Sequence, residues 1–137
     1  MDLPTLIAQL RDALLAEEQV RLAYLFGSAL IAPDFRDVDV GVWASELDAL
    51  HPGLRIEQRL QWGARLERSL RPRRFVDLHV LNGAPLPFQY TVVRTGRLLL
   101  VRSEIERIRY EAGLASAYLD FAESLRPFET AVLARIG

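Results

Sequence analysis

Two apolar runs joined by a short polar segment constrain this chain more than any other feature of its sequence. The first run, residues 20–26, ends at Gly27-Ser28, and the second, residues 37–43, opens with Asp37 and Asp39 on either side of Val38. Both runs have the length and the apolar content of buried strands. Because side chains alternate between the two faces of a strand, the two aspartates are expected to project together from one face.

The paired carboxylates suggest a metal site. Two ionised carboxylates side by side repel each other unless a cation lies between them, and oxygen-only ligands suit Mg²⁺. The alternative is a solvated strand edge, which is the usual explanation of an isolated Asp-x-Asp pattern. The Gly-Ser turn just upstream and a third candidate carboxylate, Asp77, favour the metal site.

Length and composition indicate a single α/β domain with a real core. The chain has 137 residues, of which 50% are hydrophobic, and its net charge of −1 argues against a general nucleic-acid-binding protein. It contains no cysteine, so it has no disulfide framework and no thiolate site, which is compatible with the cytoplasm. The sequence shows neither an apolar run of membrane-spanning length nor a basic leader, so we expect no membrane span and no signal peptide.

Helix and strand signals alternate along the chain and predict a small mixed β-sheet flanked by helices. The expected strands are residues 20–26, 37–43, 74–81 and 97–101, and the first two are expected to pair. The expected helices are residues 2–18, 54–70 and 85–94, a short helix within 27–32, and a long last helix that starts after Ser103 and is broken by Pro127. The predicted organisation is therefore one domain, 1–137, made of a core, 1–126, and an apolar tail, 127–137, that either docks onto a partner or folds back.

The third strand places one more carboxylate within an apolar run. Phe75, Asp77 and His79 share one face of that strand, and an unpaired aspartate is costly to bury there. Asp77 therefore needs a cation or a hydrogen-bond donor, and His79 is a possible donor, although a packed strand histidine is the simpler interpretation. If the second and third strands are neighbours, Asp37, Asp39 and Asp77 meet at one edge of the sheet.

Three carboxylates that meet beside a Gly-Ser turn favour phosphoryl chemistry. Metal ions held by such carboxylates clamp a triphosphate and align an attacking hydroxyl. The turn offers backbone N–H groups and a hydroxyl to phosphate oxygens. The sequence shows no Ser/His/Asp or Cys/His arrangement, so nucleotidyl transfer fits better than hydrolysis by a catalytic triad.

Three segments, Leu25-Phe26-Gly27-Ser28, Asp37-Val38-Asp39-Val40 and Val76-Asp77-Leu78, together resemble the signature of the DNA polymerase β-type nucleotidyltransferases. Within that superfamily the chain is most similar to the minimal nucleotidyltransferases, the MNT antitoxins that are paired with HEPN-domain toxins. Residues 87–99 and 118–121 resemble that subgroup as well, so the resemblance covers most of the chain.

The resemblance implies a nucleotidyltransferase-like fold and an ATP- and Mg²⁺-dependent adenylyltransferase that modifies a tyrosine of its partner, a HEPN ribonuclease toxin. In this role Gly27 and Ser28 would hold the nucleotide phosphates, and Asp37 and Asp39 would bind the metals. Asp77 would complete the catalytic metal site and help to activate the attacking hydroxyl. The last helix and the tail would contact the toxin. The resemblance further implies a cytoplasmic protein without a direct nucleic-acid ligand, and it leaves room for a homodimer when the toxin is absent.

One departure from the family pattern lies between the Gly-Ser turn and the first aspartate. The family usually has ten residues there, with an Arg-Gly pair and a serine before the aspartate, whereas this chain has the eight residues 29–36, no such pair, and Arg36 at the serine position. Arg36 is a candidate source of the missing positive charge. Two other functions stay open: an antitoxin that neutralises its toxin by binding alone and, ranked lower because no second domain builds an acceptor pocket, a small-molecule nucleotidyltransferase.

Overall fold

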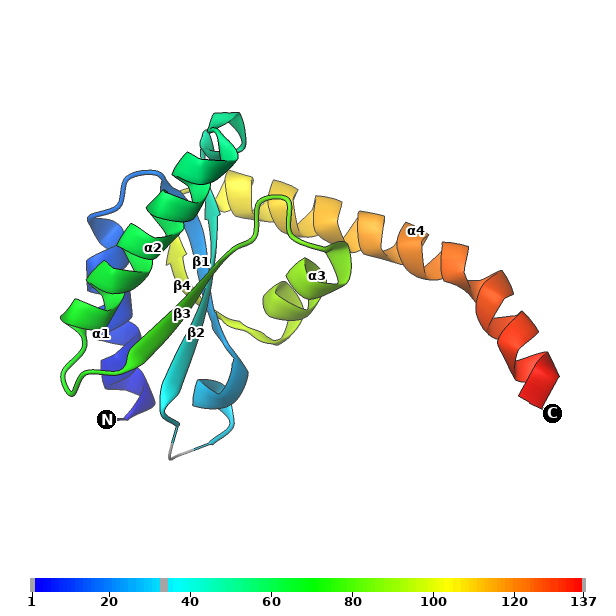
Figure 1. The fold of residues 1–137 in the computed structure, drawn as a ribbon, viewed down its shortest axis with the longest axis horizontal. Coiled ribbons are helices and arrows are strands. Elements are labelled where there is room, and N and C mark those ends of the chain that lie inside the picture. The colour runs from blue at the N-terminus through cyan, green and yellow to red at the C-terminus, as the bar shows by residue number, and fades with distance from the viewer. Residues whose placement is uncertain (1, 33–34, 137) are drawn as a thin grey trace.

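The computed structural model describes residues 2–32 and 35–136, and this part of the chain forms one mixed sheet with helices on both faces (Figure 1). The strands are β1 (Val20–Phe26), β2 (Asp37–Ala44), β3 (Phe75–Val80) and β4 (Arg97–Val101). The helices are α1 (Leu3–Leu15), α2 (Pro52–Ser69), α3 (Leu86–Thr95) and α4 (Glu104–Ile136), with the short 3₁₀ helices η1 (Gly27–Leu30) and η2 (Leu47–Ala49). The predicted fold class and the four predicted strands are confirmed.

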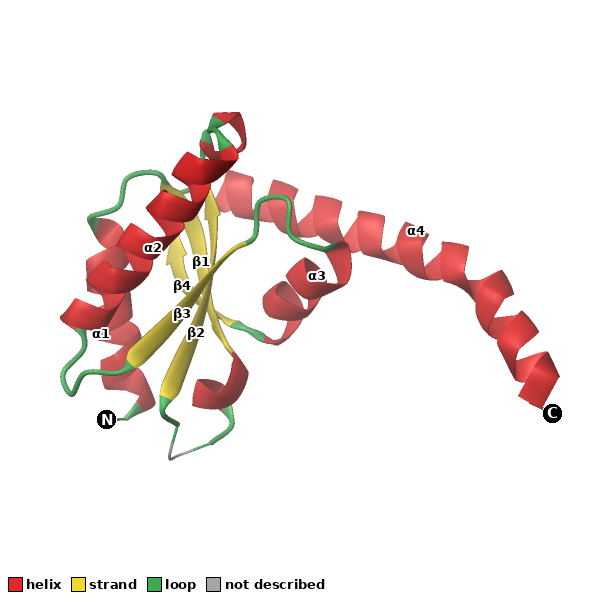
Figure 2. Cartoon of the chain, in the orientation of Figure 1, coloured by secondary structure: helices red, strands yellow, loops and turns green. Residues whose placement is uncertain are grey.

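The strand order is β3-β2-β1-β4, and β1 runs antiparallel to both of its neighbours. The predicted pairing of the first two strands is therefore confirmed. Strand β3 lies parallel to β2 because α2 carries the chain back across one face of the sheet between them (Figure 2). The helices α1 and α2 cover this face, and α3 and the first half of α4 cover the other (Figure 1).

The main core lies between the sheet and the pair α1 and α2. Helix α1 contributes a stripe of fully buried leucines with helical spacing, and α2 contributes the buried Trp62 and Leu66. Each such side chain stabilises the fold by about 1.5–3 kcal/mol relative to an exposed one. The alternate residues of β2 (Val38, Val40, Val42) point into this core, so Asp39 necessarily faces α3 and α4 on the other side.

Arg102, which follows β4, ties the end of α1 to the sheet. Its guanidinium donates hydrogen bonds of 3.0–3.2 Å to the carbonyl oxygens of Leu14, Leu15, Glu17 and Val20. The first three carbonyls belong to the end of the helix and the turn after it, and the oxygens of Leu14 and Glu17 also accept backbone N–H groups, from Glu17 and Val20 respectively. One side chain therefore adds charged donors at the end of α1 and joins it to β1.

The predicted break at Pro127 is wrong, because α4 continues through this residue to Ile136. A proline inside a helix removes one hydrogen bond, in this helix to the carbonyl of Glu123, and bends the helix away from that oxygen. This part of α4 is exposed, so water can take the place of the missing donor. Figure 1 shows α4 leaving the domain and curving towards its end, so the apolar tail extends the helix and does not fold back onto the core.

The lengths and polarities of the helices bear on membrane insertion. None of the helices formed by the described residues is both long enough and apolar enough to cross a membrane.

Candidate active site

The parallel register of β2 and β3 places functional groups from the two strands side by side. Asp39 is the register partner of Asp77, and Gly41 is that of His79, so all four residues lie on the α3 side of the sheet. One ligand atom from each of Asp39, Asp77 and His79 lies within 4.8 Å of the others. The structure thus brings together two of the three predicted carboxylates, and a histidine completes the group.

Asp37 occupies a different position from the other two aspartates. It is the first residue of β2, its side chain is exposed, and its register partner is Phe75. It lies outside the close group, although its charge still contributes to raising the pKa of Asp39. Asp37 is therefore at the rim of the site, on the same face as Asp39 and open to solvent.

His79 contacts both carboxylates. Its Nε2 atom lies 3.1 Å from Asp77 Oδ2 and 3.6 Å from Asp39 Oδ1. The centroids of the Phe26 and Phe88 rings each lie 5.4 Å from the centroid of the imidazole. The simpler interpretation from the sequence was a packed strand histidine, and the ring is indeed packed against two aromatic side chains, but its nitrogen lies beside the acidic groups. The spacing of two residues from Asp77 was the sequence signal for this role.

The Gly-Ser turn lies directly against the carboxylate of Asp39. Gly27 has a φ of +80°, and a Cβ atom built on it would lie 2.5 Å from Asp39 Oδ2. The position therefore requires glycine for two reasons, the left-handed backbone and the close approach of the carboxylate. Ser28 follows at the start of η1 and is exposed, so the turn offers open polar groups next to the acidic pair.

The electrostatics of Asp39 fit a site for a cation. Burial raises the pKa of its carboxyl above the usual value, the charges of Asp77 and Asp37 raise it further, and His79 opposes them. The folded chain thus holds partly buried negative charges close together, an arrangement that a bound divalent cation would relieve. Asp77 has the most open side chain of the three grouped residues, at 48% exposure against 27% for Asp39 and 29% for His79.

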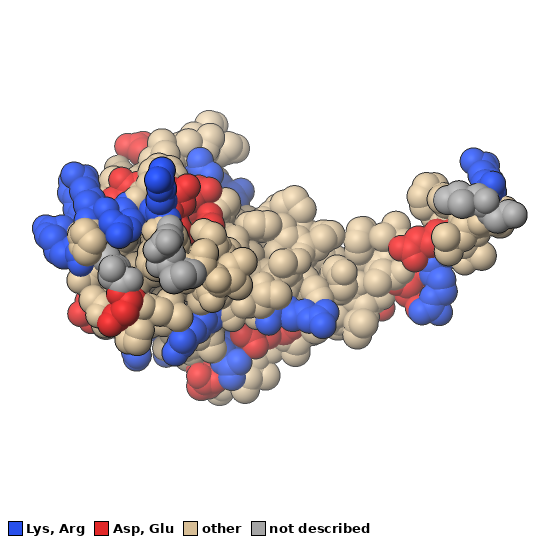
Figure 3. Space-filling view, turned by 90° about the horizontal axis from the view of Figure 1, so that it is seen from below, with Lys and Arg blue, Asp and Glu red and all other residues tan. Residues whose placement is uncertain are grey.

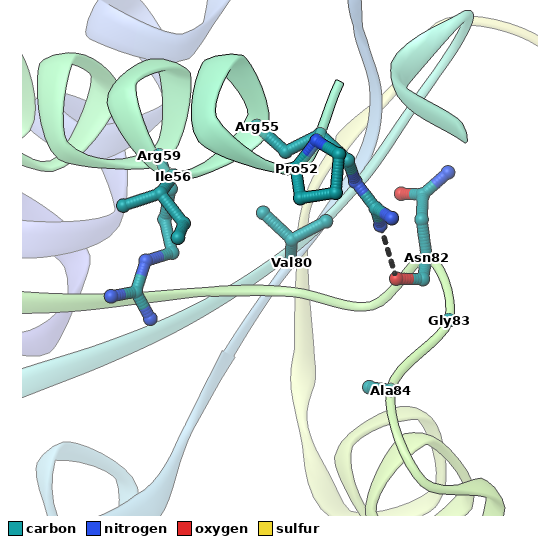
Figure 4. Close-up of a pocket in the computed structure, with 8 residues that line it drawn as sticks. All are labelled: Pro52, Arg55, Ile56, Arg59, Val80, Asn82, Gly83 and Ala84. Atoms are coloured by element: carbon teal, nitrogen blue, oxygen red, sulfur yellow. Dashed lines mark hydrogen bonds between the residues drawn. The ribbon is translucent and has the colours of Figure 1, made fainter. Parts of the chain in front are cut away.

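A separate hollow of about 400 Å³ lies where β3 ends and is bordered by the first turns of α2 (Figure 4). Its lining includes Arg55, whose guanidinium donates a 3.1 Å hydrogen bond to the carbonyl of Asn82 and lies 3.7 Å from a carboxylate oxygen of Asp48. Asn82 is itself buried and exchanges two hydrogen bonds with the backbone of Ala44. These contacts hold the segment after β3 against α2 and β2, so we assign this region a structural role.

The comparison with family models agrees with this geometry. The model described as "Polymerase beta, Nucleotidyltransferase" matches residues 8–105, which include the Gly-Ser turn, the paired aspartates of β2 and Asp77 of β3. The chain belongs to the polymerase β nucleotidyltransferase family. The match ends soon after the start of α4, so most of that helix lies beyond the part shared with the family model. No curated protein sequence matches this nucleotidyltransferase significantly.

Solved structures with the same fold come from toxin–antitoxin complexes. A chain from the structure of a tri-AMPylated Shewanella oneidensis HEPN toxin in complex with MNT antitoxin is 20% identical with a TM-score of 0.67, over 93% of this chain and 98% of that one. A chain from the toxin–antitoxin MntA-HepT is 20% identical with a TM-score of 0.68, over 93% and 97%. A chain from a toxin–antitoxin structure with AMP-PNP is 23% identical with a TM-score of 0.68, over 97% and 99%. The similarity to each extends over nearly the whole of both chains.

Proposed function

We propose that this nucleotidyltransferase is the antitoxin of a HEPN/MNT pair and transfers AMP from ATP to a tyrosine of its cognate HEPN ribonuclease toxin. The observation that carries the proposal is the meeting of the Gly27 turn with the carboxylates of Asp39 and Asp77 at one point of the sheet. The structural neighbours support it, since one contains an AMPylated HEPN toxin and another contains AMP-PNP. An ATP-dependent activity on a ribonuclease toxin fits the cytoplasm, where we expect this protein to act.

In the proposed reaction, Asp37, Asp39 and Asp77 hold divalent ions, for which we propose Mg²⁺. Bound there, the metal would neutralise phosphate charge and orient the reacting oxygens. Gly27 and Ser28 would hold the phosphates of ATP through backbone N–H groups and the hydroxyl. The exposure of the Asp77 side chain leaves it open to an incoming phenol.

The proposed transfer is a single nucleophilic displacement at the α-phosphorus of ATP. The phenolic oxygen of the toxin tyrosine forms a bond to the α-phosphorus of ATP. The bond from that phosphorus to the oxygen bridging to the β-phosphate breaks, and pyrophosphate leaves. The phenolic proton passes to the carboxylate of Asp77, which lies on the solvent side of the group.

The second half of α4 is the proposed contact surface for the toxin. Four of its apolar residues have the spacing of one helical stripe, and all are at least one third exposed (Phe121, Leu125, Phe128, Val132). The same stripe includes Leu114, which is buried in the first half of α4. In the view of Figure 3 the projecting part of α4 shows largely uncharged surface next to the domain and both acidic and basic side chains towards its end, whereas basic side chains gather at the opposite end of the domain. The apolar face that packs in the first half of α4 is therefore free for a partner in the second half.

The decisive experiment is transfer of radiolabel from the α-phosphate of ATP to the purified toxin. We expect label on the toxin with the wild-type chain, and none with Asp39→Asn or Asp77→Asn. Asp12→Asn is the matched control, because Asp12 is an exposed acid on α1, away from the site. Equal labelling by the wild type and both site variants would refute the assignment of these residues, and AMP on a toxin residue other than tyrosine would refute the acceptor.

A second function, neutralisation by binding alone, is favoured by the exposed stripe on α4. Phe128 is 69% exposed and continues an exposed apolar stripe with Leu125 and Val132, and contiguous exposed apolar surface of this kind marks interaction sites. This function predicts a stable complex with the toxin and no AMP on it. Phe128→Asp should then abolish both binding and neutralisation, while Thr130→Asp, on the opposite side of the same helix, should preserve both. If the Phe128→Asp variant still binds the toxin with wild-type affinity, the stripe is not the contact surface.

A further inference from the structure

The close group at the site contains a nitrogen donor as well as carboxylate oxygens. His79 Nε2 lies within reach of the same point as the oxygens of Asp39 and Asp77, because the three ligand atoms are within 4.8 Å of one another. Asp37, the remaining acid of β2, stands outside this group. Among the described residues, the best-formed set of donors is therefore two oxygens and one imidazole nitrogen.

The surroundings of His79 hold its ring in this orientation. Phe26 from β1 and Phe88 from α3 both pack against the imidazole, and these two rings also contact each other edge to face with their centroids 5.8 Å apart. The backbone of His79 is held by the pairing of β3 with β2. A donor that packing already orients loses little conformational entropy when it binds a ligand. The side chain is still 29% exposed, so a hydrated ion can reach it.

The type of donor bears on the choice of metal. Magnesium prefers oxygen ligands in octahedral geometry, whereas imidazole favours first-row transition metals. Among these metals, manganese also takes the octahedral coordination by carboxylate and water oxygens that suits magnesium. We propose that His79 is a direct ligand of the site metal, so that the site accepts Mg²⁺ but binds Mn²⁺ more tightly.

This inference rests on the metal site of the proposed function, but it is tested without ATP or toxin. The ligand role of His79 and the AMP-transfer activity can therefore be refuted independently of each other. A purely structural His79 that only donates a hydrogen bond to Asp77 would orient the carboxylate for both metals equally. A ligand role differs in two measurable ways. If His79 is a ligand, its removal changes the ratio of the affinities for Mn²⁺ and Mg²⁺, and the bound metal contacts its Nε2 atom directly.

The first measurement is the affinity for Mn²⁺, followed by the EPR signal of the free ion, with Mg²⁺ as competitor. The wild-type chain should prefer Mn²⁺ by at least about tenfold, because an imidazole ligand strengthens the binding of a first-row transition ion more than that of Mg²⁺. His79→Asn should lose most of this preference while it still binds both ions through the carboxylates. The control is His51→Asn, since His51 is the other histidine of the chain and caps the start of α2.

The second measurement is the ¹⁵N resonance of each imidazole ring during titration with Zn²⁺, a diamagnetic ion. The Nε2 resonance of His79 should shift on binding while both ring nitrogens of His51 stay in place. An unchanged Mn²⁺ to Mg²⁺ ratio in His79→Asn overturns the proposal, as does a His79 Nε2 resonance that Zn²⁺ leaves unmoved. Absence of binding by either Mn²⁺ or Mg²⁺ up to millimolar concentrations also overturns it. Loss of AMP transfer with the affinity ratio intact would instead count against the proposed function.

Discussion

Replacement of Gly27 by alanine tests the contact between the Gly-Ser turn and Asp39. The φ of +80° at Gly27 costs an L-amino acid about 1–2 kcal/mol. The new Cβ would lie 2.5 Å from Asp39 Oδ2, and relief of such crowding typically costs about 1–3 kcal/mol more. We therefore expect Gly27→Ala to lower the free energy of unfolding by about 2–5 kcal/mol.

Gly113→Ala is the matched control for this substitution. Gly113 lies within α4 and is exposed, and a Cβ atom added to it would have no neighbouring atom within 4 Å. Alanine favours the helix over glycine, so this variant should raise the free energy of unfolding by about 0.5–1 kcal/mol. The same chemical change thus has opposite signs at the two positions.

Urea denaturation followed by tryptophan fluorescence measures both effects. Metal titration of the folded Gly27→Ala protein adds a second readout, because a displaced Asp39 should also weaken metal binding. The reasoning is refuted if Gly27→Ala unfolds within about 0.5 kcal/mol of wild type, the range of an ordinary surface substitution. It is also refuted if the two alanine variants shift stability in the same direction.

Three further predictions concern the rest of the molecule. Arg102→Met should lower the free energy of unfolding by about 2–4 kcal/mol, because several carbonyl oxygens around the end of α1 lose a charged donor. The control is Arg109→Met, which should change this free energy little because Arg109 is exposed; urea denaturation measures both variants. Burial and the hydrogen bond to Glu111 raise the pKa of Tyr24. The folded state therefore keeps a proton that the unfolded state releases above about pH 10, and the free energy of unfolding falls there by up to about 1.4 kcal/mol per pH unit. Tyr24→Phe should flatten that fall, and an unchanged slope between about pH 10 and 11 would contradict this assignment to Tyr24. Arg36→Ala should raise the KM for ATP with little change in unfolding free energy if this exposed residue supplies phosphate-binding charge, and an unaltered KM would exclude it.

Local patterns in the sequence determine the elements and the family of this protein. The limits of β1 and β4 and the start of β2 match the predictions, because apolar alternation and turn residues act over a few neighbouring positions. The Gly-Ser turn and the aspartates of β2 and β3 are sufficient to indicate nucleotidyl transfer. A glycine after α3 predicted the end of that helix, and Gly96 does cap it, although with extended rather than left-handed backbone.

The arrangement of the site depends on tertiary structure. Whether Asp77 stands beside Asp39 or Asp37 is decided by the register of two strands that α2 separates in sequence, and packing of α2 on the sheet sets that register. The same register brings His79 to the carboxylates, where its ring packs against two aromatic rings from β1 and α3. Local sequence patterns do not contain distances between such remote segments.

The end of α4 is a second feature that local sequence patterns do not determine. Pro127 has the local signature of a helix end, yet the helix continues through it. The free energy that a proline costs inside a helix depends on whether the carbonyl that loses its N–H partner finds another donor. On this projecting, exposed helix water can donate to it. Sequence alone therefore determined which groups this protein has and in which elements, while the packing of those elements decided which groups meet and which face of α4 stays open.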